Sequence, residues 1–138
     1  MKLLQPPGWA APKGYANGVA ARGTFVAIGG QIGWNAQQAF ETDDFVAQAR
    51  QALENVVAVL AEAGGRPEHL VRLTWYVVDR DEYAGALREV GRAYREVVGR
   101  HYPAMTAVEV GALIEPRARV EIEATAVIPD EAAIGDRR

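Results

Sequence analysis

The sequence predicts a single α/β domain, of mixed α+β type, in which two helices cover one face of a mixed β-sheet. The chain has 138 residues, which suits one domain with its own core. Segments that alternate as strands surround two longer segments with apolar residues at helical spacing. Two helices are too few to cover both faces, so we expect the second face to meet another subunit.

Composition excludes several classes of protein. Hydrophobic residues make up 49% and charged residues 24% of the chain, an ordinary globular balance. A net charge of −3 with scattered basic residues argues against nucleic-acid binding. The absence of cysteine excludes disulfides and thiolate metal sites, and we expect His69 and His101 to be surface residues. We therefore expect no metal, no cofactor and no membrane segment, and a cytoplasmic location.

The order of elements follows from turn residues and apolar spacing. We expect an irregular arm over residues 1–13 and a tail over residues 129–138. Gly29 and Gly30 interrupt an early strand, which predicts a bulge or a close backbone approach. The predicted strands are Gly18–Ala21, Thr24–Ile28, Leu70–Val78, Met105–Val110 and Val120–Ile128.

Two amphipathic helices are predicted between the strands. Thr42 is positioned to cap the first helix, and Gly64 with Gly65 ends it. Its apolar stripe consists of Phe45, Ala49, Ala52, Leu53, Val56, Val57 and Leu60. Asp79 or Asp81 is expected to cap a second, continuous helix that runs to Val97.

The last strand has two chemically different sides. One side carries Val120, Ile122, Ala124 and Ala126, and the other carries Arg119, Glu121, Glu123 and Thr125. In the strand before the second helix, Arg72, Thr74 and Tyr76 oppose Val71, Leu73, Trp75 and Val77. Periodicity alone leaves open which side meets the helices. It also leaves open whether Arg119 pairs with Glu121 or with Glu123.

Five segments together resemble the Rid/YjgF family, also called the L-PSP endoribonuclease family. They are Gly14–Val19, Phe25–Gly33, Gln48–Ala63, Pro103–Val110 and Val120–Val127. The resemblance covers residues 14–128 and implies a chorismate-mutase-like fold. It also implies a homotrimer with a small-molecule site in each cleft between subunits.

The resemblance implies roles for particular residues. Well-studied family members hydrolyse 2-imino acids to 2-keto acids and ammonia. Carried over to this chain, Glu121 is the catalytic residue that holds the attacking water, and Tyr15 comes from the neighbouring subunit. The other substrate-binding positions are Gly29, Gly30, Gln31, Thr106 and Ala107.

The chain departs from the family pattern at two of its implied substrate-binding positions. Met105 stands where the family has the arginine that binds the substrate carboxylate, and a thioether cannot replace that cation. Losing one partner of such a pair costs about 2–5 kcal/mol, or roughly 30- to 3,000-fold in recognition. Gly91 aligns with a family asparagine, so we expect either close packing or additional ligand room there. Arg72 and Arg119 are candidates to replace the lost cation.

Three functions are therefore weighed. The first is hydrolysis of an imine or enamine with a non-standard substrate, in which Glu121 acts as general base. The second is a non-catalytic trimer that binds small molecules in its clefts, with Trp34 as a further lining candidate. Ribonuclease activity is the third, and the acidic balance of the chain disfavours it.

Overall fold

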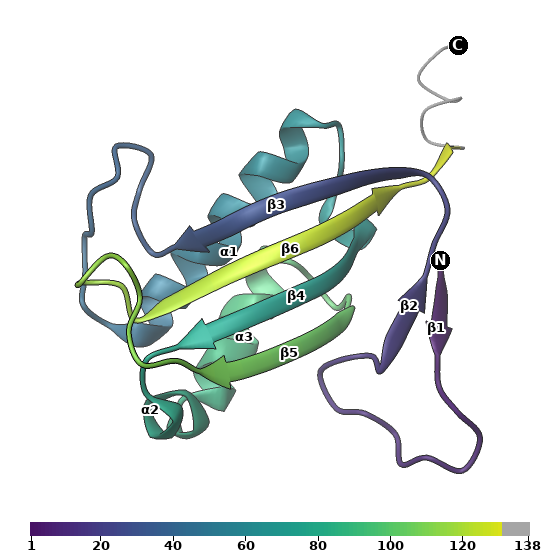
Figure 1. The fold of residues 1–138 in the computed structure, drawn as a ribbon, viewed down its shortest axis with the longest axis horizontal. Coiled ribbons are helices and arrows are strands. Elements are labelled where there is room, and N and C mark those ends of the chain that lie inside the picture. The colour runs from purple at the N-terminus through teal and green to yellow at the C-terminus, as the bar shows by residue number, and fades with distance from the viewer. Residues whose placement is uncertain (131–138) are drawn as a thin grey trace.

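The computed structural model describes residues 1–130, which fold as a four-stranded sheet with helices on one face (Figure 1). Its elements run in the order β1 (Lys2–Leu4), β2 (Gly18–Ala20), β3 (Thr24–Ile32), α1 (Phe45–Glu62), η1 (Pro67–His69), β4 (Leu70–Val77), α2 (Arg80–Gly85), α3 (Leu87–Val97), β5 (Ala104–Glu109) and β6 (Val120–Ile128). The predicted mixed sheet with two main helices on one face is confirmed.

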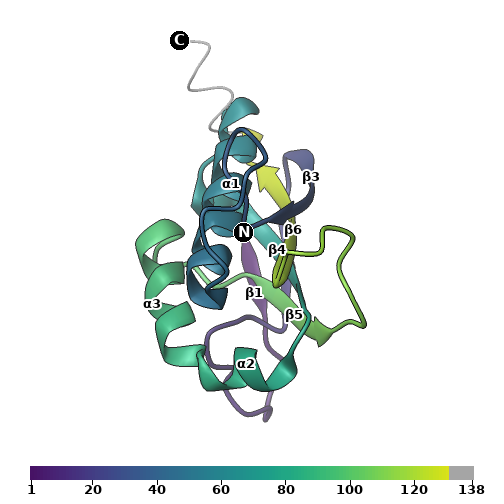
Figure 2. The ribbon, with the colours of Figure 1, turned by 90° about the vertical axis from the view of Figure 1, so that its left-hand side faces the viewer.

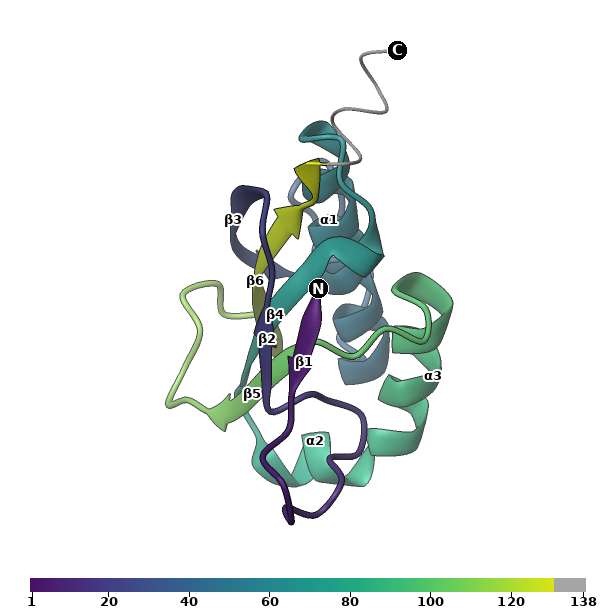
Figure 3. The same ribbon diagram turned by 90° about the vertical axis from the view of Figure 1, so that its right-hand side faces the viewer.

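The sheet has the strand order β3-β6-β4-β5. β6 pairs antiparallel with both β3 and β4, and β4 pairs parallel with β5. Helices α1 and α3 lie side by side over one face, whereas the connection between β5 and β6 projects on the other side (Figures 2 and 3). The second face therefore stays open in the single chain.

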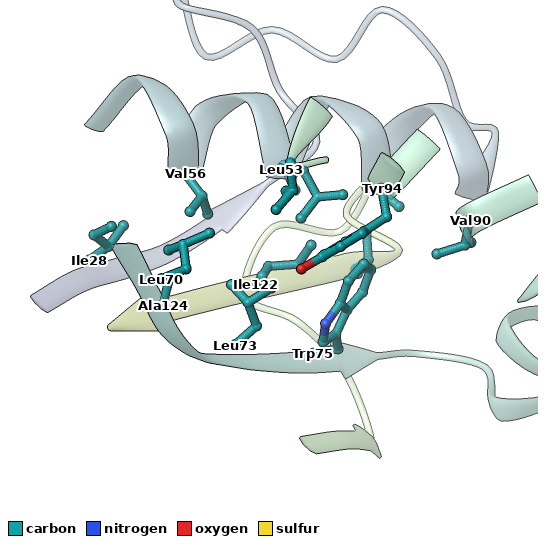
Figure 4. Packing of buried hydrophobic residues seen from close by; sticks show 14 of the residues in the cluster. Ile28, Leu53, Val56, Leu70, Leu73, Trp75, Val90, Tyr94, Ile122 and Ala124 are labelled. Carbon is teal, nitrogen blue, oxygen red and sulfur yellow. The ribbon is translucent and has the colours of Figure 1, made fainter. Parts of the chain in front are cut away.

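Alternate residues of the central strands build the core. Ile122 of β6, Leu73 of β4 and Leu53 of α1 are each fully buried. Figure 4 shows Leu53 and Val56 of α1 directed at the apolar side chains of the sheet. The set Val120, Ile122, Ala124 and Ala126 is thus the one that meets the helices. A register shift between Leu70 and Arg72 puts Leu70 in the core, where the sequence favoured Val71.

A buried amide joins the first helix to the loop before β6. Gln48 of α1 is fully buried, and its Nε2 donates to the carbonyl oxygens of Thr42 and Arg117 at 3.0 Å each. Its Oε1 accepts the N–H of Arg119 at 2.8 Å. Three partners satisfy this amide, so its burial carries little penalty.

Some local predictions are wrong, and the reasons are physical. The N-terminal arm is not irregular throughout, because Lys2–Leu4 pairs with Gly18–Ala20 as a hairpin. Asp44, not Thr42, caps α1: its carboxylate accepts the N–H of Ala47 at 2.9 Å, whereas the Thr42 hydroxyl accepts the N–H of Asp44. The residues 131–138 of the predicted tail lie outside the described part of the chain.

The second helix is divided where the sequence predicted continuity. Asp79 caps α2 by accepting the N–H groups of Asp81 and Glu82. The helix ends at Gly85, and α3 begins at Leu87 after a break at Ala86. Glycine is a poor helix former, so Gly85 disfavours a continuous helix at this point.

Both histidines differ from the prediction of surface positions. His69 is only 6% exposed, and its Nδ1 accepts the N–H of Arg66 at 3.0 Å. His101 is half-buried, and its Nε2 donates to the carbonyl of Leu70 at 2.7 Å. Their backbone partners explain the burial, since short polar contacts to the chain replace contacts with water.

Candidate functional site

The open face of the sheet carries the Glu121 carboxylate directly over Gly30. Glu121 of β6 is half-buried, and its cross-strand partner on β4 is Tyr76. A Cβ atom at Gly30 would overlap the Glu121 carboxylate, so this position tolerates only glycine without a shift of the side chain. The predicted bulge between Ile28 and Gln31 is present, and it puts the Gly30 backbone beside the carboxylate.

A second carboxylate on the same face is already bonded. The Tyr76 hydroxyl donates to Glu123 Oε1 at 2.6 Å, and this bond raises the pKa of the Tyr76 phenol. Arg72 and Gly29 line a hollow beside Glu123 on this face. The open face therefore combines two carboxylates, a phenol and a guanidinium.

The sequence suggested that Arg119 pairs with Glu121 or with Glu123, but it pairs with neither. Its Nε donates to Glu82 Oε1 at 2.8 Å, and that hydrogen bond raises the pKa of Arg119. Glu82 belongs to α2, which is distant in sequence from β6, so residue spacing along β6 could not predict this pair. Arg119 is thus held by a protein carboxylate and is poorly placed to bind a substrate carboxylate.

Met105 and Gly91 lie in one groove on the helix-covered side, at the β5 edge of the sheet. The groove encloses about 460 Å³, within the range of small-molecule sites. It runs between α3, β5 and the N-terminal arm. Its lining residues are Lys13, Gly14, Trp75, Tyr83, Leu87, Val90, Gly91, Tyr94, Arg95, Tyr102 and Met105.

Met105 and Glu121 leave opposite faces of the sheet. Met105 pairs with Leu73, which pairs with Ala124, and this row faces the helices. Glu121 pairs with Tyr76. It lies two residues from Glu123 on β6, so both carboxylates are on the open face. Cross-strand partners share a face, so one subunit cannot direct both side chains into one cleft.

The remaining predicted substrate-binding residues also divide between the two faces. Thr106 pairs with Thr74 in the row of Glu123, on the open face. Ala107 pairs with Trp75, on the covered side. Gln31 turns back on the bulge, where its Nε2 donates to the carbonyl of Gly29 at 3.1 Å.

Tyr15 stands at the edge of β5 and is 42% exposed. Its neighbour Ala16 forms an isolated parallel bridge with Ala104, and the Ala16 N–H donates to the carbonyl of Pro103 at 3.0 Å. Tyr15 lines a hollow of about 480 Å³ together with other N-terminal residues and with His101, which lies between α3 and β5. Trp34 lies elsewhere, where it packs against Phe40 with ring centroids 5.9 Å apart.

Sequence reasoning missed the aromatic and cationic part of the groove. Tyr94 and Tyr102 stack at 5.5 Å, and Trp75 and Tyr83 approach to 6.3 Å. Burial raises the pKa of Tyr83, so its phenol stays neutral. Arg95 follows Gly91 by four residues on α3, and this spacing was the available signal that both share a helix face.

Three further findings concern the described residues. Between residues 1 and 130, no cluster of three or more side chains is suited to hold a metal ion. No helix in that range is long and apolar enough to cross a membrane. In the same range, the Trp75 indole N–H is a buried donor without a partner. Buried donors are normally bonded, so this N–H group is an exception, and the Trp75 side chain also lines the groove.

Comparison with known proteins identifies the family. The family described as Endoribonuclease L-PSP matches residues 8–128. The chain belongs to this family. It is 36% identical over 116 residues to the 2-iminobutanoate/2-iminopropanoate deaminase of Salmonella typhimurium, with 82% of this chain and 86% of the relative covered. It is 37% identical over 105 residues to a RutC family protein of Pasteurella multocida, covering 76% and 81% of the two chains.

Solved structures agree with the family assignment. A Rid family protein of unknown function from Yersinia pestis has a TM-score of 0.81 at 30% identity, covering 92% of this chain and 98% of that one. TdcF of Escherichia coli, solved with bound serine, has a TM-score of 0.68 at 30% identity and covers 93% and 99%. The resemblance of the sequence to the Rid/YjgF family is thereby confirmed.

Proposed function

We propose that this family member hydrolyses a reactive imine or enamine to a carbonyl compound and ammonia. Glu121 carries the proposal, because it is a half-buried carboxylate held over the glycine backbone of a strand bulge. Glu121 would take a proton from water as the water oxygen bonds to the imine carbon. The nitrogen receives that proton from Glu121 and then the proton of the new hydroxyl group, the C–N bond breaks as the C=O bond forms, and ammonia leaves.

The deaminases among its relatives support this reaction class. TdcF, with its bound serine, supports the idea that this fold holds a small molecule. The family description, Endoribonuclease L-PSP, implies RNA cleavage, whereas a net charge of −3 disfavours binding to RNA. We therefore do not propose RNA cleavage, and a cytoplasmic location stays a prediction.

A homotrimer is part of the proposal, because the two halves of the site leave opposite faces of the sheet. In a cleft between copies, the open face of one subunit can meet the Met105 edge of its neighbour. Tyr15 and the positions Gly29, Gly30, Gln31, Thr106 and Ala107 keep their predicted roles in substrate binding.

The assembly is tested by placing a charge on the open face. Ala27→Arg should reduce the molar mass from three chains toward one in light scattering, because a buried unpaired charge is costly. Val59→Arg, at an exposed position of α1, is the matched control and should remain trimeric. A wild-type chain that scatters as a monomer contradicts this part of the proposal.

The reaction is tested with freshly generated imines and measurement of ammonia release. Glu121→Gln should lower turnover roughly 10²- to 10⁴-fold, as expected for loss of a general base. The fold should remain, since Glu121 is not in the core. Tyr76→Phe removes the neighbouring phenol without touching the proposed base and serves as the control. Equal rates for the Glu121 variant and wild type would refute the role of this carboxylate.

Met105 defines a second experiment on substrate choice. Met105→Arg should raise activity on 2-iminopropanoate if the scaffold is otherwise competent, because it returns a cation to β5. The second candidate function, a non-catalytic binding trimer, is favoured by the neutral thioether at this position. It predicts ligands that raise the melting temperature without any ammonia release.

A further inference from the structure

The groove between α3 and β5 has an uneven distribution of charge. Two cationic residues line it, Lys13 from the N-terminal arm and Arg95 from α3, and the lining includes no acidic residue. The chain as a whole has a net charge of −3. A locally positive groove on an acidic protein favours an anionic ligand through charge complementarity.

Arg95 lies where it can reach such a ligand. Its Nη1 atom is 3.3 Å from the position that a Cβ would take at Gly91, so the guanidinium lies along this glycine. Residues four apart on a helix share a face, and Gly91 therefore leaves the room that the arginine side chain uses. Arg95 is solvent-exposed, and within residues 1–130 it has no carboxylate in an ion pair.

The walls of the groove favour an aromatic or large apolar body. The ring centroids of Trp75 and Tyr83 lie 6.3 Å apart, and Tyr102 stacks on Tyr94 at 5.5 Å. Met105 adds a polarizable thioether, which contacts aromatic rings favourably. Trp75 and Tyr94 are nearly buried, so the apolar surface left for a ligand belongs to Tyr83, Tyr102 and Met105, which are partly exposed, and to Leu87, which is exposed. A small aliphatic ligand would leave much of that surface in contact with water.

We propose that Arg95 anchors the carboxylate of an aromatic or large apolar ligand, whose body lies between the aromatic walls and Met105. The anion anchor thus comes from α3, whereas the residue on β5 supplies an apolar contact. This inference rests on the proposed function, because it names the substrate class of the cleft that Met105 lines. Arg72, on the open face, and Arg119, bonded to Glu82, do not enter this groove.

Three related probes separate the two parts of the ligand. Phenylpyruvate has both ring and carboxylate, pyruvate lacks the ring, and phenylacetone has a methyl group in place of the carboxylate. Calorimetric titration of the full chain should show phenylpyruvate binding at least about tenfold more tightly than either. Phenylacetone lacks the charge-assisted hydrogen bond, which contributes about a decade or more in affinity, and pyruvate lacks the apolar ring surface that binding would bury.

Substitution on α3 identifies the anchor. Arg95→Gln should weaken phenylpyruvate binding about tenfold or more and leave phenylacetone unchanged, so the two affinities converge. Arg88→Gln, at an exposed position of the same helix outside the groove, should leave both unchanged. Arg95→Glu should reverse the preference, favouring 2-phenylethylammonium over phenylpyruvate. Circular dichroism of each variant checks that the helix is intact.

The outcomes separate this inference from the proposed function. Arg95-dependent binding of phenylpyruvate without turnover of any imine supports the anchor and refutes the hydrolase. Imine turnover with phenylpyruvate binding that is equal in wild type and Arg95→Gln overturns the anchor and keeps the hydrolase. No phenylpyruvate binding by wild type, or binding no tighter than that of phenylacetone, also overturns it.

Discussion

The covered and open faces of the sheet are built by alternate residues of the same strands, but they carry different chemistry. Ile122 and Leu73 face the helices and are fully buried. Glu121 and Glu123, which flank Ile122 on β6, face the open side with Tyr76 of β4. Stability is therefore concentrated on one face and ionisable chemistry on the other. The β5 edge, where Met105 lies, is the place where the two regions meet.

The largest expected effect tests whether stability is concentrated on the covered face. Ile122→Ala should lower the free energy of unfolding by about 2–5 kcal/mol, because it removes buried methylene groups and leaves a cavity. Thr125→Ala, on the open face of the same strand, should change it by no more than about 0.5 kcal/mol. Urea unfolding with comparable slopes measures both. Similar losses at the two positions would contradict the contrast.

A pair of glycines in and beside β3 makes the same comparison at smaller scale. At Gly33 a Cβ would lie 2.5 Å from the Gln48 Cβ, whereas at Gly29 it would meet nothing within 4 Å. Gly33→Ala should cost about 1–3 kcal/mol as overpacking displaces the bonded Gln48 amide. Gly29→Ala should be neutral within about 0.5 kcal/mol. Thermal unfolding of both variants decides the point, and a tolerated Gly33→Ala would show that α1 shifts easily.

The smallest expected effect is a pH dependence that arises from His69. Desolvation lowers the pKa of His69, which stays neutral in the fold while accepting the Arg66 N–H. Below about pH 6.5 the unfolded chain binds a proton that the folded chain resists, so stability falls with decreasing pH. The slope from this group is at most about 1.4 kcal/mol per pH unit. His69→Gln should flatten the curve between pH 7 and 5; an unchanged slope would assign the effect to other groups.

The fold was largely predictable because its signals are local. The stripe from Phe45 to Leu60 gave α1, and the Gly29-Gly30 pair gave the bulge. The break at Ala86 was missed, since the apolar stripe continues across it while the backbone does not. Thr42 was preferred over Asp44 as cap because both residue types suit the position and only geometry distinguishes them.

The candidate site was predictable only in part, because the segments that form it are distant in sequence. Resemblance singled out Met105 and Gly91, which the structure brings into one groove. Arg95 follows Gly91 by four residues on the same helix, whereas Lys13 and Tyr102 join that groove from two other segments, and no spacing rule connects them. The bond between Arg119 and Glu82 was missed for the same reason. Division of the site between two faces of the sheet depends on strand register, which periodicity did not assign.

The bridge between Ala16 and Ala104 has a consequence for divergence among related chains. The hairpin of β1 and β2 pairs with itself, and the arm reaches the larger sheet through this isolated bridge. Mutations in the arm thus alter the rim of the groove while Leu53, Leu73 and Ile122 stay untouched. We expect ligand preference to evolve faster than the fold, because the arm contributes to the rim of the groove but not to the buried core.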